Sequence, residues 1–297
     1  MAREFLVGTA SWTDPTLVKT DLFYPPDAKT AAQRLAFYAS HFPTVEVDSS
    51  YYAILSEDVV RLWAERTPPG FVFNVKAFAW MTQHPAETKR LPTTIKSILP
   101  ENLKSSARVK SPPAELLALA FQMFWSSLKP LRDAGKMGWV LFQLPPYVTY
   151  RKSNLEYLGG LSERLPGGDV AVEFRHPSWT DSSHRTATLD FLRDRGLAYV
   201  STDAPAQSGL VSILSATTSD AYIRFHGRSG ETWFKRNISA AERFKYLYAE
   251  RELAEWAGRI KQLGGVRRAF AIFNNCYSNF GIMNATTMRE MLSRPEP

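Results

Sequence analysis

The 297-residue chain contains a single cysteine, Cys276, so it cannot form a disulfide bond within itself. One cysteine fits a reducing compartment, and we therefore expect a cytoplasmic protein. The chain also lacks any apolar run approaching the roughly 20 residues that a membrane span needs, which predicts no membrane partner. A predicted strand begins at Phe5, so we expect no secretory signal peptide before it.

Motifs of several enzyme classes are missing as well. The end of the first predicted strand and the turn after it, Gly8-Thr9-Ala10-Ser11-Trp12, contain one glycine, whereas a doubly wound nucleotide-binding fold usually carries a glycine-rich turn there. No Gly-x-Ser-x-Gly motif is present, so an arrangement of Ser11 or Ser49 with His226 has weak support. Paired cysteines and the spacing His-x-x-x-His are absent too. We therefore predict no cofactor and no specific metal ligands, while His, Glu and Asp at the strand ends keep a divalent metal open as an alternative.

The clearest positive signal is a set of eight short apolar runs that alternate with period two, as strands do. Their ranges are Phe5–Thr9, Thr44–Asp48, Phe71–Lys76, Gly138–Gln143, Val170–Arg175, Leu197–Thr202, Ala221–His226 and Arg268–Asn274. Segments with helical spacing lie between them. This alternation predicts an α/β fold, a single TIM-type (β/α)8 barrel with parallel strands that spans residues 1–297.

The helical segments are less regular than the strands. Their predicted ranges are Thr30–Ser40, Glu57–Arg66, Pro113–Ala134, Asn154–Arg164, His184–Arg195, Ser239–Leu263 and Asn284–Leu292. Ser239 and Glu242 form a capping-box pattern, which predicts a helix start at that point. The segment 204–219 carries no clear helical signal.

One long segment after the third strand, residues 84–113, lacks clear periodicity and is rich in basic residues. It holds two acidic residues, Glu87 and Glu101, against Lys89, Arg90, Lys96, Lys104, Arg108 and Lys110. A basic loop inserted here would overhang the barrel mouth, where it would act either as a lid or as a solvated loop. The net charge of +7 likewise favours anionic partners.

Polar side chains gather at the carboxyl ends of the predicted strands, which a parallel barrel brings to one mouth. Lys76, Arg175 and Arg224 are candidates for a clamp that binds a phosphate, carboxylate or sulfate group. Gln143 and Asn274 would add neutral hydrogen bonds to a substrate. A salt-bridge network that only closes the barrel is the alternative, because buried charges need partners.

The same strand ends supply candidate catalytic residues. Glu173 and His226 are expected to act as general base and general acid, with Glu46 and Asp203 orienting them. Glu46 and Glu173 also face each other as paired carboxylates, as glycoside hydrolysis would require. A basic neighbour such as Arg175 would lower a carboxyl pKa rather than keep one carboxyl protonated, which argues against that chemistry.

Aromatic residues lie just beyond several strand ends. Flat rings beside convergent polar groups suit the stacking of a sugar or a base, so Trp12, Tyr51 and Trp179 are candidate substrate contacts. Ordinary core packing is the alternative for each of them.

The motifs at these strand ends resemble those of a known family. They are Gly8-Thr9-Ala10-Ser11-Trp12, Val45-Glu46-Val47-Asp48-Ser49-Ser50-Tyr51-Tyr52, Phe71-x-Phe73-x-Val75-Lys76 with His84-Pro85, Phe142-Gln143-Leu144-Pro145-Pro146, Glu173-Phe174-Arg175-His176-Pro177-Ser178-Trp179, Arg224-Phe225-His226-Gly227-Arg228 and Phe273-Asn274-Asn275. Together they resemble the YecE-like proteins, the domain-of-unknown-function family numbered 72, over essentially the whole chain. The resemblance implies a TIM-type barrel but no agreed reaction. That family's fold has been likened to endonuclease IV and the sugar isomerases, which is analogy only.

Three positions depart from the family pattern. Ser11 stands where the opening motif has its second glycine, and Asp48 stands where the family commonly has asparagine. Gln83 is an extra residue before His84, which leaves the role of that histidine open.

These observations favour an enzyme, a hydrolase or lyase that acts on an anionic and phosphorylated substrate at the barrel mouth. A nucleic-acid-binding protein, or a metal-dependent hydrolase of the endonuclease type, is the alternative that the basic charge and the aromatics support. A second alternative is a small-ligand binder without catalysis. The expected partner is thus an anionic small molecule or a nucleic acid, and the oligomeric state stays open.

Overall fold

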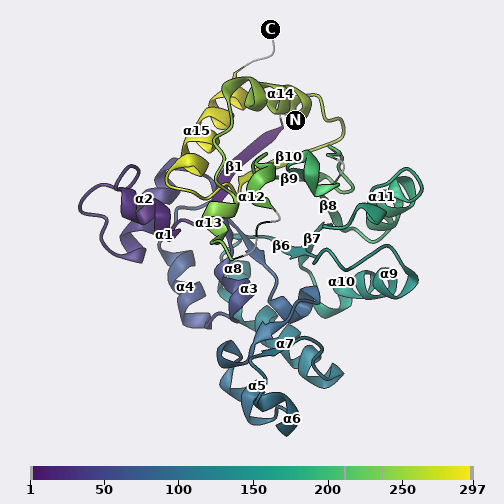
Figure 1. Cartoon of the computed structure of the whole chain (residues 1–297). Helices are drawn as coiled ribbons and strands as arrows, with labels where there is room; N and C mark the ends of the chain where they lie inside the picture. Colours follow the sequence, from purple (N-terminus) through teal and green to yellow (C-terminus); the bar gives the residue numbers. More distant parts are fainter. Residues whose placement is uncertain (1–2, 211, 234, 236, 295–297) are drawn as a thin grey trace.

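The computed structural model describes residues 3–210, 212–233, 235 and 237–294, so the ends of the predicted domain lie outside the described residues. Eight strands close into a parallel barrel in the order β1-β10-β9-β8-β7-β6-β3-β2 (Figure 1), which confirms the predicted fold. Their bounds are Glu4–Ala10 (β1), Thr44–Val47 (β2), Val72–Lys76 (β3), Met137–Gln143 (β6), Asp169–Glu173 (β7), Ala198–Asp203 (β8), Asp220–Phe225 (β9) and Arg268–Phe273 (β10). Each predicted strand is present and differs only at its end residues.

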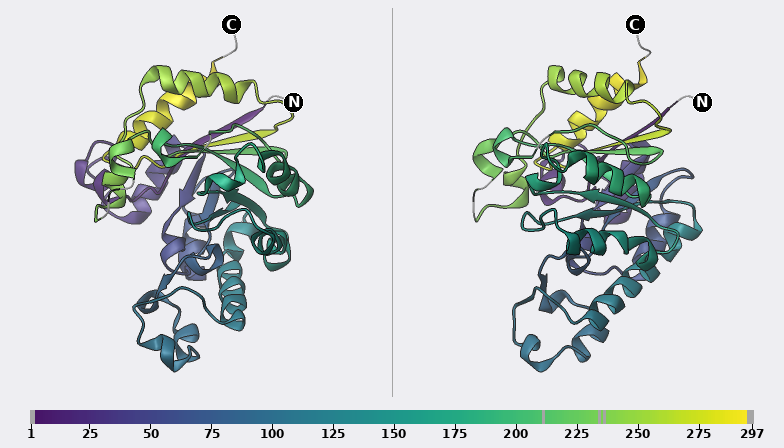
Figure 2. Two further views of the ribbon diagram at one scale, coloured as in Figure 1. Left: turned by 45° about the vertical axis from the view of Figure 1, so that its right-hand side comes forward. Right: turned by 90° about the vertical axis from the view of Figure 1, so that its right-hand side faces the viewer.

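Helices lie mostly around the outer side of the barrel (Figures 1 and 2). Their bounds are Pro15–Thr20 (α1), Ala31–His41 (α2), Ser49–Tyr52 (α3), Glu57–Glu65 (α4), Thr93–Ser97 (α5), Glu101–Lys104 (α6), Ala114–Ser127 (α7), Lys129–Asp133 (α8), Lys152–Gly159 (α9), Leu161–Arg164 (α10), Arg185–Asp194 (α11), Gly230–Trp233 (α12), Ala240–Arg243 (α13), Glu250–Lys261 (α14) and Phe280–Ser293 (α15). Because side chains alternate along a strand, Val7 and Val140 pack under the helices, while Leu6 and Leu141 fill the barrel interior.

Two of the predicted helices are each interrupted by a residue that disfavours continuation. The segment predicted as Pro113–Ala134 ends as α7 at Ser127 and restarts as α8, which has Pro130 in its first turn. Proline has no backbone N–H and is tolerated only at such a helix start. The segment predicted as Asn154–Arg164 is divided at Gly160 in the same way.

The predicted helix Ser239–Leu263 is wrong in its middle. The capping box is present, since Ser239 Oγ accepts from the Glu242 N–H at 3.1 Å. However, α13 ends at Arg243 and α14 begins only at Glu250. Between them the buried Tyr248 packs on Phe225 and accepts a hydrogen bond from the Gly227 N–H at 2.8 Å, which a continuous helix would not allow.

The segment 204–219 is consistent with its lack of helical signal. Apart from residue 211, which lies outside the described residues, it contains only a short 3-10 turn at Ala206–Ser208.

The basic insertion after β3 contains regular structure that its sequence did not predict. The strands Ala86–Glu87 (β4) and Arg108–Val109 (β5) pair antiparallel and enclose α5 and α6. Ile95 and Leu99 are buried, and Val109 O accepts a hydrogen bond from Trp80 Nε1 at 2.8 Å. Helices α5 and α6 lie beside α7 at the lower end of the molecule, far from α14 and α15 (Figures 1 and 2).

Candidate functional site

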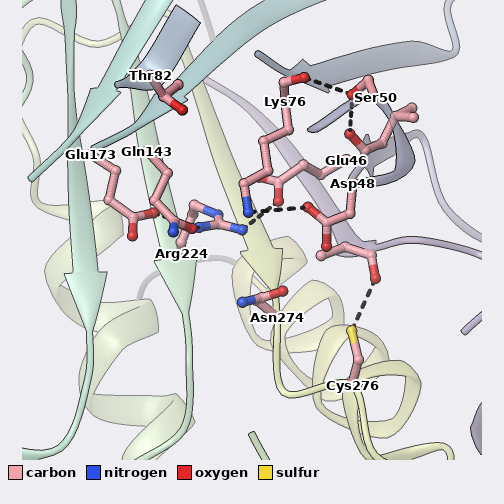
Figure 3. A network of polar contacts seen from close by, with 12 residues as sticks. Glu46, Asp48, Ser50, Lys76, Thr82, Gln143, Glu173, Arg224, Asn274 and Cys276 are labelled. Atoms are coloured by element: carbon pink, nitrogen blue, oxygen red, sulfur yellow. Dashed lines mark hydrogen bonds and ion pairs between the residues drawn. The ribbon is translucent and has the colours of Figure 1, made fainter. Parts of the chain in front are cut away.

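Alternation along the strands decides which polar side chains enter the barrel. Tyr222 packs inside the barrel, so Arg224, two residues further along β9, points the same way. Ala171 and Glu173 repeat this relation on β7. Figure 3 shows Arg224 and Glu173 converging with Glu46 from β2 at the centre of the mouth. The period-two pattern therefore brings together groups that are far apart in the sequence.

Arg224 is the centre of a fully buried ion network. Its guanidinium lies 2.5 Å from Glu46 Oε1 and 2.5 Å from Glu173 Oε2, and it donates to Gln143 Oε1 at 3.1 Å. The side chains of Arg224 and both glutamates are 0% exposed. Burial alone would lower the pKa of Arg224, but Glu173 and Glu46 hold that pKa well above its ordinary value. Arg224 is thus the counter-ion of two carboxylates rather than the substrate contact that the sequence predicts.

Glu46 and Glu173 share Arg224 but are shifted in opposite directions. Burial raises the pKa of Glu46 although Arg224 opposes it, and the Tyr222 hydroxyl donates to Glu46 Oε2 at 2.8 Å. Burial acts on Glu173 in the same sense, but Arg175 and Arg224 outweigh it and hold the pKa of Glu173 well below its ordinary value. Two carboxyls whose pKa values are pushed apart form an arrangement that enzymes use to separate acid from base.

Arg175 connects this buried network to the mouth. It forms an ion pair with Glu173, its side chain is 10% exposed, and its Nη2 donates to His226 Nε2 at 3.0 Å. Nε2 also lies 3.2 Å from Glu173 Oε1, so this nitrogen faces a guanidinium that can only donate and a carboxylate that can only accept. Nδ1 lies 3.0 Å from the side-chain amide of Asn274.

His226 is neutral at physiological pH in this setting. Burial, and then the positive charge of Arg175, lower the pKa of His226 to about 3. A neutral imidazole is a weak proton donor, so the lowered pKa argues against the general-acid role predicted for this residue. His226 instead lies against the Arg175–Glu173 ion pair, with Nε2 3.0 Å from Arg175 Nη2 and 3.2 Å from Glu173 Oε1.

Lys76 lies beside this network at the end of β3. Its Nζ is 3.9 Å from Asp48 Oδ1 and 4.9 Å from the centre of the Tyr51 ring. Burial lowers the pKa of Lys76, and Asp48 opposes that shift. Figure 3 shows Lys76 extending toward Asp48. The backbone carbonyl of Lys76 accepts a hydrogen bond from the Ser50 hydroxyl at 2.6 Å. Lys76 is therefore the partner of Asp48 and is not among the residues that line the cavity with Arg175.

Arg224 Nε and Asp48 Oδ1 are buried polar atoms without a hydrogen-bond partner among the described residues, although Lys76 Nζ lies 3.9 Å from Asp48 Oδ1. Glu173 Oε1 and Arg175 Nε make no hydrogen bond of ordinary geometry either, but they form an ion pair with each other. Buried polar atoms without a hydrogen bond are uncommon in native proteins, and each calls for an explanation.

A cavity of about 460 Å³ opens directly above Arg175. Its lining is His84, Gln143, Leu144, Pro146, Arg175, His176, Pro177, Ser208, Leu210, Trp233, Arg243 and Phe244. Two guanidinium groups thus face the cavity, and no carboxylate does so among the described residues. Arg243 donates to the backbone carbonyls of Trp233 and Lys235, which fixes its position without neutralising its charge. Trp233 lies over the Arg175 guanidinium at 5.3 Å.

The charges of the mouth leave a positive excess at this cavity. Below it, the carboxylates of Glu46, Asp48 and Glu173 balance the three cations Lys76, Arg175 and Arg224. Arg243 has no acidic partner among the described residues, so it adds an unbalanced positive charge. A cavity with this excess favours an anionic ligand.

Of the residues that line the cavity, sequence reasoning selected Gln143 and Arg175. Arg243 and Phe244 fall inside the predicted helix Ser239–Leu263, whose interruption brings them to the mouth, and Trp233 precedes that helix in a segment without a predicted element. The histidine His84 was noticed but left without a role. The one available signal was composition, since aromatic and basic residues stand next to each other at both ends of the segment 233–245.

Asp203 does not belong to the site, which corrects its predicted role. Val200 lies three residues earlier on β8 and packs inside the barrel. Because side chains alternate along a strand, Asp203 points outward. There its carboxylate is held by Arg228 at 2.7 Å and by Trp256 Nε1 at 2.5 Å. Asp203 therefore ties β8 to α14 and the loop after β9.

Two of the three predicted stacking aromatics are also core residues. Trp179 is fully buried, stacks on Phe174 at 4.3 Å and donates to a backbone carbonyl. Trp12 is 6% exposed and packs edge-on against Trp63 at 5.2 Å. Only Tyr51 lies in the mouth, where it contacts Lys76.

The departures from the family motifs have visible structural consequences. Ser11, at the glycine position of the opening motif, has φ 70°, a conformation that favours glycine. The extra residue Gln83 has φ 64° and ends the 3-10 turn Ala79–Thr82. Ser11 and Gln83 thus both have a left-handed backbone conformation at the edge of the mouth.

The part of the chain that the structure describes contains neither a metal-binding cluster nor a membrane-spanning helix. There, no three His, Cys, Asp or Glu side chains gather closely enough to hold a metal ion. No helix within the same residues is long and apolar enough to cross a membrane.

Comparison with known proteins agrees with the geometry. The model of the family "Protein of unknown function DUF72" matches residues 6–297. UPF0759 protein YunF of Bacillus subtilis strain 168 is 31% identical over 294 residues, which cover 96% of this chain and 94% of that protein. A DUF72 structure from Thermotoga maritima MSB8 has a TM-score of 0.76 at 29% identity and covers 98% of this chain and 100% of that one. One from Enterococcus faecalis V583 has a TM-score of 0.74 at 22% identity and covers 99% of both chains. The chain therefore belongs to the DUF72 family.

Proposed function

We propose that this protein is an enzyme, a hydrolase or lyase, whose substrate is a small anionic and phosphorylated molecule bound in the mouth cavity. The observation that carries the proposal is the cavity lining, which contains Arg175 and Arg243 and, among the described residues, no carboxylate. Inorganic and organic phosphates are bound most often by such donor-only side chains. The single cysteine, Cys276, supports a cytoplasmic setting.

In this proposal Arg175 contacts the anionic group of the substrate. Glu173 and His226 hold the guanidinium from below, so that its charge is already oriented before the substrate arrives. Fixed charges of this kind stabilise negative charge that develops in a transition state. Trp233 and Phe244 would contact the remainder of the substrate across the cavity.

A thermal-shift screen against phosphosugars, nucleotides and carboxylates tests the binding step. A ligand at 100 times its Kd should stabilise the native state by about 2.7 kcal/mol, or roughly 4 °C for a chain of this size. We expect a shift from one class of phosphorylated compounds that Arg243→Ala abolishes and the exposed control Arg193→Ala retains. If no anionic small molecule shifts the transition, or Arg243→Ala changes nothing, the proposal fails.

Turnover separates an enzyme from a small-ligand binder. Glu173→Gln removes the charge that holds Arg175, so we expect it to abolish conversion of any compound that the screen identifies. Glu156→Gln, on the exposed face of α9, is the matched control and should convert the compound normally. Unchanged conversion by Glu173→Gln would remove Glu173 from the mechanism.

Nucleic-acid binding is a second candidate because two exposed tyrosines near the mouth carry cations over their rings. Arg90 lies 5.5 Å from the centre of the Tyr52 ring, and Lys110 lies 4.8 Å from that of Tyr147. Stacking platforms beside basic groups are typical of single-strand binding. This candidate predicts affinity for oligonucleotides that falls steeply with salt, and it fails if they do not bind at low salt.

A further inference from the structure

A second cavity, of about 330 Å³, adjoins the first one at the base of the insertion. It is lined by Tyr51, Tyr52, Ala79, His84, Pro85, Ala86, Glu87, Arg90 and Arg108. Its charge is positive as well, because the Glu87 carboxylate faces three cations. Arg90 lies 2.9 Å from it, and Lys89 and Arg108 each lie 3.5 Å from it. One carboxylate cannot neutralise three cations, so this cavity also favours an anionic group.

His84 lines both cavities and stands where they meet. Its position depends on Gln83, whose left-handed backbone turns the chain after the 3-10 turn Ala79–Thr82. The Gln83 carbonyl is fixed by the Tyr147 hydroxyl at 2.6 Å, and the His84 N–H donates to Ala79 O at 2.9 Å. The extra residue in the third motif therefore aims this histidine at the junction.

The hydrogen bonds of His84 determine which ring nitrogen accepts. When the Thr82 hydroxyl donates to Ala79 O at 3.0 Å, it can only accept from Nδ1 of His84, at 2.9 Å. Hydrogen bonding thus assigns the ring proton to Nδ1 and leaves a lone pair on Nε2. Burial, followed by the charges of Lys76 and Arg175, lowers the pKa of His84 to about 4, so the ring stays neutral at physiological pH.

We propose that the two cavities form one bipartite site for a ligand that has an anionic group at each end and a hydroxyl group between them. This inference rests on the proposed function, since the first anionic group is the one held by Arg175 and Arg243. Arg90 and Arg108 hold the second anionic group. The hydroxyl group of the ligand donates a hydrogen bond to His84 Nε2. A ligand group that can only accept hydrogen bonds could not make this contact.

Isothermal titration with three commercial or simple synthetic probes tests the bipartite site. The probes are fructose 6-phosphate, fructose 1,6-bisphosphate and the bisphosphate of hexane-1,6-diol, which lacks hydroxyl groups. We expect the sugar bisphosphate to bind at least tenfold more tightly than the monophosphate. It should also bind about fivefold more tightly than the diol bisphosphate, the contribution of roughly one hydrogen bond.

Three variants assign these differences to residues. Arg108→Ala should bring the affinities for the sugar bisphosphate and the monophosphate within about threefold of each other. His84→Phe keeps a ring but removes the acceptor, so it should abolish the preference over the diol bisphosphate. The exposed control Arg193→Ala should keep both preferences.

The outcomes separate this inference from the proposed function. Equal affinity of wild-type protein for the mono- and bisphosphate, with binding lost in Arg243→Ala, overturns the bipartite site and leaves the proposed function standing. Retention of both preferences in Arg108→Ala and His84→Phe also overturns the inference. If no probe binds to the wild-type protein, the proposed function itself fails with it.

Discussion

Replacing Arg224 with methionine tests the ion network most severely. Arg224 is the shared partner of Glu46 and Glu173, and all three side chains are 0% exposed. Methionine preserves the length of the side chain but leaves both carboxylates short of positive charge. Glu173 keeps Arg175, whereas Glu46 keeps only the Tyr222 hydroxyl and the more distant charge of Lys76. Removing one member of a buried pair costs about 3–5 kcal/mol, and we expect Arg224→Met to lose that much at pH 7.5.

The loss should depend on pH in a defined direction. The pKa of Glu46 is already raised by burial, and removal of Arg224 raises it further. A carboxyl whose folded pKa exceeds its unfolded value stabilises the fold below the unfolded pKa and loses that stability as pH rises through the folded one. The deficit of Arg224→Met relative to wild type should therefore shrink as pH is lowered from 7.5 to 5.

Urea unfolding at the two pH values measures both effects by linear extrapolation. The double variant Glu46→Gln/Arg224→Met removes the uncompensated charge, so it should be more stable than Arg224→Met alone at pH 7.5. A loss below about 1 kcal/mol, or a loss that is the same at pH 5 and pH 7.5, would refute the account of a charge-compensated core. If Arg224→Met is too unstable to fold at pH 7.5, the same comparison at pH 5 against the double variant decides.

Three further predictions concern single residues. Ser11→Gly should raise the free energy of unfolding by about 0.5–1 kcal/mol, because glycine accepts φ 70° without strain; a lower stability would contradict this. Asp203→Asn should cost roughly 2 kcal/mol through its contacts with Arg228 and Trp256 and leave the affinity for a cavity ligand unchanged, as urea unfolding and calorimetry would show. His226 should stay neutral at pH 5 in an NMR titration, since its pKa is lowered to about 3. A histidine with a lowered folded pKa makes stability fall as pH drops below about 6.5, and a ring already charged at pH 5 would refute the assignment.

The barrel was predictable because its strands repeat one simple pattern. Alternation with period two marks each strand, and a parallel barrel then brings their carboxyl ends together without further information. Glu46, Glu173 and Arg224 were found in this way. The same rule failed for Asp203 because β8 is buried on both faces, so its apolar residues did not reveal which parity points inward.

The cavity was less predictable because loops and very short helices build it. Trp233 ends α12 and Arg243 ends α13, helices too short to leave a clear period in the sequence. The place of Arg243 and Phe244 depends on the buried Tyr248, which lies where a continuous helix was predicted. The secondary structure of the insertion was equally hard to predict, because its short helices bury only a few apolar residues such as Ile95. The sequence left a salt-bridge network open as the alternative to an anion clamp, but it could not tell a substrate-binding arginine from one committed to two carboxylates.

The most direct test of the central claim is a crystal structure of the protein soaked in tungstate, with the anion located by anomalous scattering. Tungstate is a tetrahedral oxyanion that can stand in for a phosphate group. The account predicts a peak in the mouth cavity within hydrogen-bonding distance of the guanidinium groups of Arg175 and Arg243. Tungstate bound only at the outer surface, or absent from the cavity at a concentration that occupies other sites, would contradict it.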